Sequence, residues 1–517
     1  MALANPIREA VTAGRFSYMV ELVASQLSRE AKLFQTASDL ARVPGLIGAG
    51  ITSYAGGSLG HDPIRVGTAA RARGLTPNVH ITCVNRSREQ VLRALEDLYL
   101  LGIENVFAIT GDYPQSKEKS SPPLFAMDSV QLVETISELR AAGMPFFTSV
   151  AVSPFKYTEA DCAYQYLKLE KKIAAGADWA ITQLGYDARK FRELKRYLDE
   201  RGLKTPVYGN VYILPVKAAE KFSKAEPPGC WVSKELVEQV QAESKAPDKG
   251  MAARLERAAR TVAILRGLGY AGAYLGGDHN ADRIRWIIQR SEAVASRWEE
   301  FAEEFCYSPK DGFYFFDQHT EPTKPRGFVP VAMDAMGKVF DVKHEGPLKS
   351  ALRGVAGWVD KHPKMASALE RFEFSIKEPM FGCQSCGNCV LSDMEYVCPM
   401  TCPKNLRNGP CGGTFNGQCE VIPEKPCIWV GVYNRAKTAG QLNDLKTYIP
   451  PRKLALKGTS SWINLFLDRD SRPGNNPEPL KVELVQIRNA GIPPKVYDPA
   501  NEPTERILVN TGAGDGA

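Results

Sequence analysis

The feature that most constrains the fold is an alternation of short apolar runs of β type with longer amphipathic stretches. Eight such runs can be counted, at residues 18–23, 46–52, 78–84, 105–110, 145–152, 178–184, 206–214 and 271–276. In the intervening segment 87–102, Val91, Leu95 and Leu98 share one helical face, and Gly102 is placed to end the helix. Strands that alternate with helices predict a parallel sheet of the α/β class, and eight of them predict a closed (βα)8 TIM barrel.

The length of the chain predicts more than one domain. A chain of 517 residues exceeds what a single hydrophobic core normally supports. The Pro- and Gly-containing stretch 309–327 is typical of a connection between domains. We expect a barrel domain over residues 1–300, a smaller cysteine-rich metal-binding domain over 301–460, and an extended tail over 461–517, which is rich in Pro, Gly and Asn.

Charge and hydropathy exclude several classes of partner. The net charge of +6 is spread over 65 basic and 59 acidic side chains, without the concentrated basic stripe that nucleic-acid binding requires. The N-terminal segment has no uninterrupted apolar region, and nowhere do about 18 apolar residues run together. We therefore expect a cytoplasmic protein that binds no nucleic acid and has no membrane span.

Polar residues stand at the ends of several predicted strands, where the chemistry of a TIM barrel is located. They are Glu21, Thr52, His80, Thr82, Thr110, Asp112, Gln183, Asp278 and His279. We expect these side chains to converge on one mouth of the barrel. A polar rim is also an ordinary property of barrels, and it would explain any one of these residues equally well.

Glu21 and the turn after the fourth strand carry the most specific chemistry. Burial of Glu21 inside a strand would raise the pKa of its carboxyl and make it a general acid near neutral pH. The alternative is a structural ion pair with a Lys or Arg of a neighbouring strand. In "ITGDYP" (109–114), Gly111 allows close backbone approach and Asp112 projects past the strand end, although an ordinary turn would explain this sequence as well.

The order of these motifs resembles the methylenetetrahydrofolate reductase family over about residues 15–290. The motifs that carry the resemblance are "VELV", "GIT", "HITC", "GIENVFAITGDYP", "KKIAAGADWAITQLGYD" and "ILPV". The resemblance implies a non-covalent flavin, FAD in most members with FMN as the alternative. The flavin would deliver hydride to 5,10-methylenetetrahydrofolate and leave 5-methyltetrahydrofolate.

The resemblance also implies roles for individual residues. Glu21 matches the acid that protonates N10 of the folate, Asp112 matches a residue near flavin and pterin, and Gln183 matches one that binds the pterin. The implied flavin contacts are Thr52, His80, Thr110, Gly111, Asp112, Lys171 and Lys172. Two departures stand out. The family's usual Arg after strand eight is missing from residues 275–280, and Lys156 stands where many members have a His against the flavin.

The second half of the chain contains a dense cysteine cluster. Eight of the twelve cysteines lie within 45 residues, at Cys383, Cys386, Cys389, Cys398, Cys402, Cys411, Cys419 and Cys427. Clustered cysteines in a reducing cytosol are more often metal ligands than disulfides. The spacing fits an iron–sulfur cluster and a zinc site equally, and reduced free thiols are the less favoured alternative. This region resembles the C-terminal extension of some bacterial members of the family, most distinctively in "NGPCGGTFNGQCE" (408–420).

The sequence therefore favours an oxidoreductase of one-carbon metabolism, a flavoprotein that reduces 5,10-methylenetetrahydrofolate. Its electrons would come from NAD(P)H or from a redox protein, and we expect a homo-oligomer. Two alternatives remain open. One is a flavin-free tetrahydrofolate methyltransferase or demethylase on the same barrel, and the other is a non-catalytic metal-binding adaptor.

Overall fold

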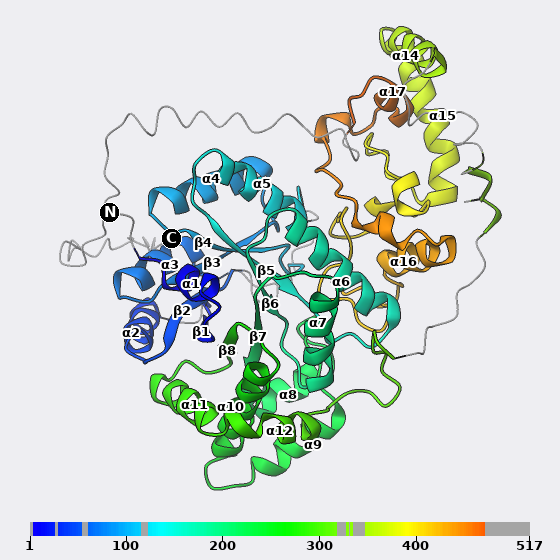
Figure 1. Cartoon of the computed structure of the whole chain (residues 1–517). Coiled ribbons are helices and arrows are strands. Elements are labelled where there is room, and N and C mark those ends of the chain that lie inside the picture. Colours follow the sequence, from blue (N-terminus) through cyan, green and yellow to red (C-terminus); the bar gives the residue numbers. More distant parts are fainter. Residues whose placement is uncertain are drawn as a thin grey trace, which may run out of the picture.

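The computed structural model describes residues 4–25, 29–53, 60–114, 123–317, 327–329, 331–333, 335 and 347–470. The predicted tail beyond residue 470 and residues 318–326 of the predicted connection lie outside the described residues. So does the pair of glycines that follows the "GIT" motif. The described chain forms a barrel with a smaller helical region packed against one side of it (Figure 1).

The barrel is closed by eight parallel strands that pair in chain order, with β1 next to β8. The strands are β1 (Ser17–Leu22), β2 (Leu46–Ile51), β3 (Pro77–Thr82), β4 (Asn105–Ile109), β5 (Phe147–Val152), β6 (Trp179–Thr182), β7 (Val207–Tyr212) and β8 (Gly272–Gly276). Each corresponds to one of the eight predicted runs, and its ends lie within two residues of the ends of that run. The predicted (βα)8 barrel is therefore confirmed.

Most of the helices form the outer layer of the barrel (Figure 1), whereas the first packs its Ile7 and Val11 against the residues inside the barrel. They are α1 (Pro6–Thr12), α2 (Glu30–Leu40), α3 (Pro63–Ala72), α4 (Arg88–Leu100), α5 (Ser129–Ala141), α6 (Glu159–Ala174), α7 (Ala188–Glu200), α8 (Val216–Phe222), α9 (Lys234–Glu243), α10 (Met251–Gly267), α11 (Ala281–Ala293) and α12 (Trp298–Glu304). Helix α4 begins at a capping box between Ser87 and Gln90, and Gly102 follows its end with a φ of 67°.

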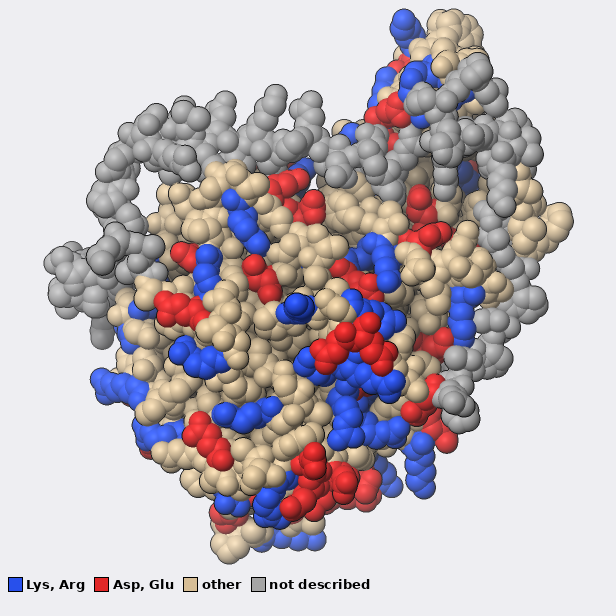
Figure 2. All heavy atoms as spheres, viewed as in Figure 1, with Lys and Arg blue, Asp and Glu red and all other residues tan. Residues whose placement is uncertain are grey.

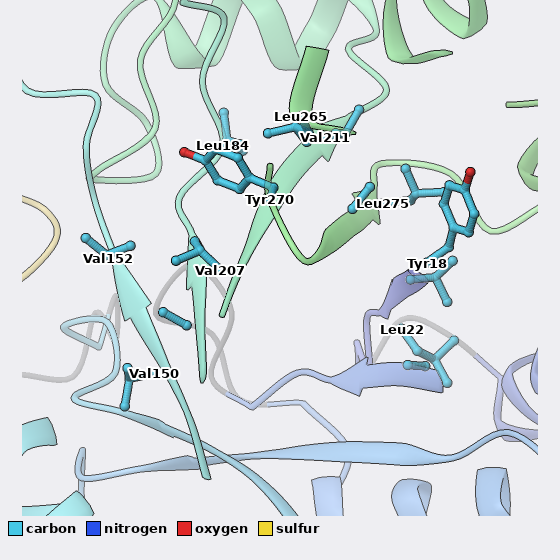
Figure 3. Packing of buried hydrophobic residues seen from close by; sticks show 14 of the residues in the cluster. Tyr18, Leu22, Val150, Val152, Leu184, Val207, Val211, Leu265, Tyr270 and Leu275 are labelled. Carbon is cyan, nitrogen blue, oxygen red and sulfur yellow. The ribbon is translucent and has the colours of Figure 1, made fainter. Parts of the chain in front are cut away.

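The alternation of side chains along each strand divides them between two cores. Outward residues pack under the helices, as Figure 3 shows for Val150 and Val152 of β5 and for Val207 and Val211 of β7. Inward residues fill the N-terminal half of the barrel with aromatic rings. These include Phe107, Phe147, Trp179, Tyr208 and Tyr274. Because these rings occupy one half of the barrel, open space remains only toward the C-terminal ends of the strands.

The cysteine-rich extension packs against α6 of the barrel (Figure 1) and accepts a hydrogen bond from Gln131 of α5 at the carbonyl of Ile449. Its helices are α14 (Pro347–Asp360), α15 (Pro363–Phe381), α16 (Ile428–Ala439) and α17 (Ser461–Phe466), the last lying within the segment predicted as tail. Tyr164 and Leu167 of α6 share an apolar cluster with Trp429 and Val432 of α16. The interface is therefore a continuous core and not only a surface contact.

The surface of the described residues carries both signs of charge. Figure 2 shows basic and acidic side chains interspersed over the face in view. Within the described ranges, no helix combines the length and the apolar character needed to cross a membrane.

Candidate functional site

A cavity of about 420 Å³ lies at the C-terminal mouth of the barrel, within the size range of small-molecule sites. Its lining includes the predicted residues Glu21, Thr52, His80, Thr110, Gly111, Asp112, Lys172 and Gln183. Asp112 and Gln183, which are far apart in sequence, thus face the same space. Four other predicted residues are not part of this lining, namely Thr82, Lys171, Asp278 and His279.

The strand alternation explains why Glu21 and His80 face this cavity. On β1, Val20 and Leu22 point outward to the helices, so Glu21 points inward. On β3, Val79 and Ile81 likewise point outward and leave His80 inside. The same rule brings Asn210 of β7 and Tyr274 of β8 to the cavity, and neither was predicted from the sequence.

Glu21 has the electrostatics of a carboxyl without a counter-ion. Burial raises the pKa of its carboxyl to about 7. No Lys or Arg among the described residues forms an ion pair with it. Its surroundings are Tyr212, Tyr274 and the backbone of Gly276. The structure therefore gives no support to the alternative of a structural ion pair, and a carboxyl in this state is half protonated near neutral pH.

Several polar atoms around the cavity have no hydrogen-bond partner among the described residues. They are His80 Nε2, Ser153 Oγ, Asn210 Oδ1 and Tyr274 Oη. Burial lowers the pKa of His80 to about 3, so its ring is neutral and offers one donor and one acceptor. Buried polar atoms are nearly always paired in folded proteins, so this set fits a bound heterocyclic ligand with several polar groups.

The turn after β4 has a backbone that only glycine adopts easily. Gly111 has a φ of 92°, and a Cβ added there would lie 2.8 Å from Cγ1 of Val84. The backbone of Thr110 is tied to β3, because Cys83 N donates to its carbonyl at 3.2 Å. This turn brings Asp112 to the cavity.

The adjacent lysines of α6 occupy different surroundings. Burial lowers the pKa of both Lys171 and Lys172 to about 7. Lys172 Nζ donates to the carbonyl of Ala151 at 2.6 Å and lines the cavity, whereas Lys171 Nζ is buried without a partner among the described residues. An anion such as a pyrophosphate would favour the charged form of both side chains.

The extension supplies one wall of the cavity, which the sequence did not predict. The lining includes Lys404, Pro410, Cys411, Gly412, Gly413 and Glu420. Lys156 Nζ donates to the carbonyls of Gly412, at 2.7 Å, and Thr414. The lysine that departs from the family pattern is therefore used to hold the extension.

Two side chains of α6 also hold this segment of the extension. Lys168 Nζ donates to the carbonyl of Pro410 at 2.8 Å, and Gln165 Nε2 donates to that of Cys411 at 2.8 Å. Lys168 is fully enclosed and lies near Asp128. These contacts fix the backbone of the segment over the mouth.

The other departure from the family pattern lies in the turn that contains Asp278. Asp278 forms an ion pair with Arg283 of α11 at 2.6 Å. The arginine nearest to the end of β8 in sequence is thus paired, and it does not line the cavity.

The twelve cysteines are all described, and none of them forms a disulfide bond. Cys383, Cys386, Cys389 and Cys398 line a second, small cavity of about 30 Å³ in the extension. Burial and then the neighbouring thiols of this group raise the pKa of Cys398 to about 12.

The remaining clustered thiols lie elsewhere. Cys402, Cys411, Cys419 and Cys427 form a separate group whose members interact electrostatically. In the part of the chain that the structure describes, no three or more His, Cys, Asp or Glu side chains are arranged to hold a metal ion. The described residues therefore show no coordination geometry for the predicted metal centre.

Comparison with known proteins gives two matching family models. The model described as "Methylenetetrahydrofolate reductase" matches residues 6–265, half of the chain, and "Methylene-tetrahydrofolate reductase C terminal" matches residues 362–455.

Curated relatives match part of the barrel. A 5,10-methylenetetrahydrofolate reductase of Pectobacterium carotovorum is 31% identical over 158 residues, which is 30% of this chain and 49% of that protein. The Salmonella typhimurium enzyme of the same name is 30% identical over 154 residues, 29% of this chain and 48% of that protein. Methylenetetrahydrofolate reductase 2 of Saccharomyces cerevisiae is 29% identical over 172 residues, 32% of this chain and 28% of that protein. The chain spans about half the length of the bacterial relatives, and less of the yeast one.

One solved structure is described as an uncharacterized protein from Clostridium thermocellum that binds two copies of 5-methyl-5,6,7,8-tetrahydrofolic acid. It shares 11% identity and covers 56% of this chain and 99% of its own, with a TM-score of 0.39. A score of that size does not establish a shared fold.

Proposed function

Because the chain belongs to the methylenetetrahydrofolate reductase family, we propose that it reduces 5,10-methylenetetrahydrofolate to 5-methyltetrahydrofolate with a flavin held in the barrel mouth. The observation that carries the proposal is Glu21, a carboxyl with a pKa of about 7 and no counter-ion, at a cavity shared with Asp112 and Gln183. Such a group can hold a proton at neutral pH and release it to a substrate nitrogen.

The proposed division of labour follows from the chemistry of each side chain. A flavin bound in the mouth would supply the hydride. Glu21 donates a proton to N10 of the folate, so that the one-carbon bridge opens toward the methyl product. Gln183 presents an amide to the pterin, and Asp112 accepts hydrogen bonds from the ring system.

The proposed flavin contacts are the residues whose polar groups lack partners or adjoin the cavity. Thr52, His80, Thr110, Gly111 and Asp112 would surround the ring system and its side chain, and Lys171 and Lys172 would bind its phosphate groups. FAD is the flavin proposed, with FMN as the alternative. The proposal leaves NAD(P)H and a redox protein as the two candidate electron donors.

The purified protein provides the direct test of this function. We expect it to show the visible absorption of a flavin and to form 5-methyltetrahydrofolate from 5,10-methylenetetrahydrofolate when its flavin is reduced with dithionite. Dithionite avoids any assumption about the natural donor. A colourless protein that demethylates 5-methyltetrahydrofolate would contradict the proposal and support the methyltransferase alternative.

We also propose that the clustered thiols bind iron–sulfur clusters or zinc, because they gather in two separate groups of four. Replacing Cys386 by Ser should then lower the bound metal per chain and expose residues 380–430 to protease, since thiolate ligation stabilises such small domains. Metal analysis and limited proteolysis measure both effects.

Cys306→Ser is the matched control for the metal prediction, because Cys306 is exposed and lies outside both groups. It should leave metal content and protease resistance unchanged. The absence of both iron and zinc from wild-type protein purified without chelators would rule out this proposal.

A further inference from the structure

Lys404 reaches from the cysteine-rich extension into the barrel mouth. Its side chain and that of Glu420, with which it forms an ion pair, are each only 3% exposed. Lys404 Nζ also donates a hydrogen bond to the carbonyl of Gly111 at 2.9 Å. A side chain of the extension thus holds the backbone of the turn that carries Asp112.

This contact restrains the turn from the side of the extension. On the other side, Thr110 accepts two hydrogen bonds from barrel backbone, from Cys83 N to its carbonyl and from Ser129 N to its Oγ1 at 3.3 Å. Gly111 follows with its positive φ and no side chain to pack. Glycine gives the turn more conformational freedom than any other residue would, so the bond from Lys404 to its carbonyl adds a restraint that the glycine itself does not supply.

The ammonium also balances charge in the enclosed space. Lys404 lies near enough to Asp112 for the two to interact electrostatically. The carboxylate of Glu420 is enclosed beside it, and such a group is costly without a nearby cation.

We propose that Lys404 is a positioning residue of the barrel's active site, which fixes the Gly111–Asp112 turn so that the site is complete only with the extension. The inference rests on the proposed function for its catalytic consequence, but its structural consequence can be measured without substrate. It assigns the extension a part in the chemistry that is independent of any metal.

The competing explanation is that Lys404 only stabilises the interface between the extension and the barrel, which we call a stapling role. Lys437 of the extension provides a matched control, because it forms an ion pair with Glu159 of the barrel at 2.7 Å and neither residue lines the cavity. A stapling role predicts similar effects from the loss of either lysine. A positioning role predicts an effect on the turn from Lys404 alone.

The experiment compares Lys404→Met, Lys404→Arg and Lys437→Met in the full-length protein. Amide hydrogen exchange of peptides covering residues 105–114 reports on the turn, and folate turnover with dithionite-reduced protein reports on catalysis. Lys404→Met should speed exchange in this peptide several-fold and lower kcat by about 10-fold or more, because a charge-assisted hydrogen bond is lost. Lys404→Arg should change the exchange rate and kcat less than Lys404→Met does. Lys437→Met should leave the exchange rate and kcat unchanged.

Glu420→Gln separates the two contacts of Lys404 and serves if Lys404→Met does not fold. It weakens the ion pair and keeps the bond to Gly111, so exchange at 105–114 should stay close to that of the wild type. Equal effects of Lys404→Met and Lys437→Met, or unchanged exchange in Lys404→Met, would overturn the inference.

The outcomes also distinguish this inference from the proposed function. A wild-type protein without folate turnover, whose Lys404→Met variant exchanges faster at 105–114, would refute the function and leave the restraint on the turn in place. Normal turnover and normal exchange in Lys404→Met would refute the restraint on the turn and leave the proposed function in place. Faster exchange with unchanged turnover would show that the turn is held but that its position does not matter to catalysis.

Discussion

Glu21→Gln should lower folate turnover by about 10²-fold or more while the protein keeps its fold and its visible spectrum. The amide is nearly isosteric with the carboxyl, but it has no proton to give to the folate nitrogen. Reduction of the flavin by its donor does not need that proton and should survive. Stopped-flow measurement of the two half-reactions separates the effects.

Glu134→Gln is the matched control for Glu21→Gln. Glu134 is a second carboxyl whose pKa is raised by burial, but it lies on α5 and does not line the cavity. This variant should turn over at the wild-type rate. Wild-type turnover in Glu21→Gln would remove Glu21 from the role of acid.

The pH dependence of folate turnover by the wild type should also reflect the titration of Glu21. In the proposed mechanism the neutral form of Glu21 is the active one, so the folate half-reaction should slow as pH rises through about 7, and Glu21→Gln should lack that decline. The pKa in the folded protein lies above its ordinary value of 4.5. The contribution of Glu21 to stability is therefore fully present below that value and is lost as pH rises through about 7.

Asp128→Asn should cost about 3 kcal/mol or more in the free energy of unfolding and should loosen the extension from the barrel. Oδ1 of Asp128 caps α5 by accepting from Val130 N and Gln131 N. Oδ2 accepts from the backbone amides of Arg407 and Asn408, each at 3.0 Å. Every one of these partners is a donor, so an amide nitrogen in place of either oxygen would face donors on its side. Urea unfolding and limited proteolysis measure the two effects.

Ser87→Ala is the comparison for Asp128→Asn, because Ser87 caps α4 without touching the extension. Loss of an ordinary cap costs about 1 kcal/mol. If Asp128→Asn costs no more than Ser87→Ala, the bonds to the extension do not contribute as we argue.

The fold was predictable because its signals are local. Each strand is an apolar run whose alternation can be recognised within a few residues, and the number and order of the runs define the barrel. The same local rule predicts that Glu21 and His80 face inward. It could have predicted Asn210 and Tyr274 as well, but their polar groups stand inside runs that otherwise look like core.

The other part of the site could not be predicted from local patterns. Lys404 and Glu420 lie in the cysteine-rich region, where every nearby signal indicates metal binding. Gly111, which accepts the hydrogen bond from Lys404, is almost three hundred residues earlier. Lys156 was noticed only as a departure from a family pattern. Its partners are backbone carbonyls. Every residue has a carbonyl, so the residue type gives no sign that the carbonyl accepts such a bond.

The segment that supplies one wall of the mouth is made late in the synthesis of the chain. Strand β8 ends at Gly276, whereas Lys404 to Glu420 leave the ribosome only after the connection, α14 and α15. At typical rates of synthesis this interval lasts on the order of 10 s, and the barrel is open to solvent throughout it. A large ligand can enter freely during that time. Once the segment is in place it forms one wall of the cavity, so a ligand bound there is held between two parts of the chain that are made many seconds apart.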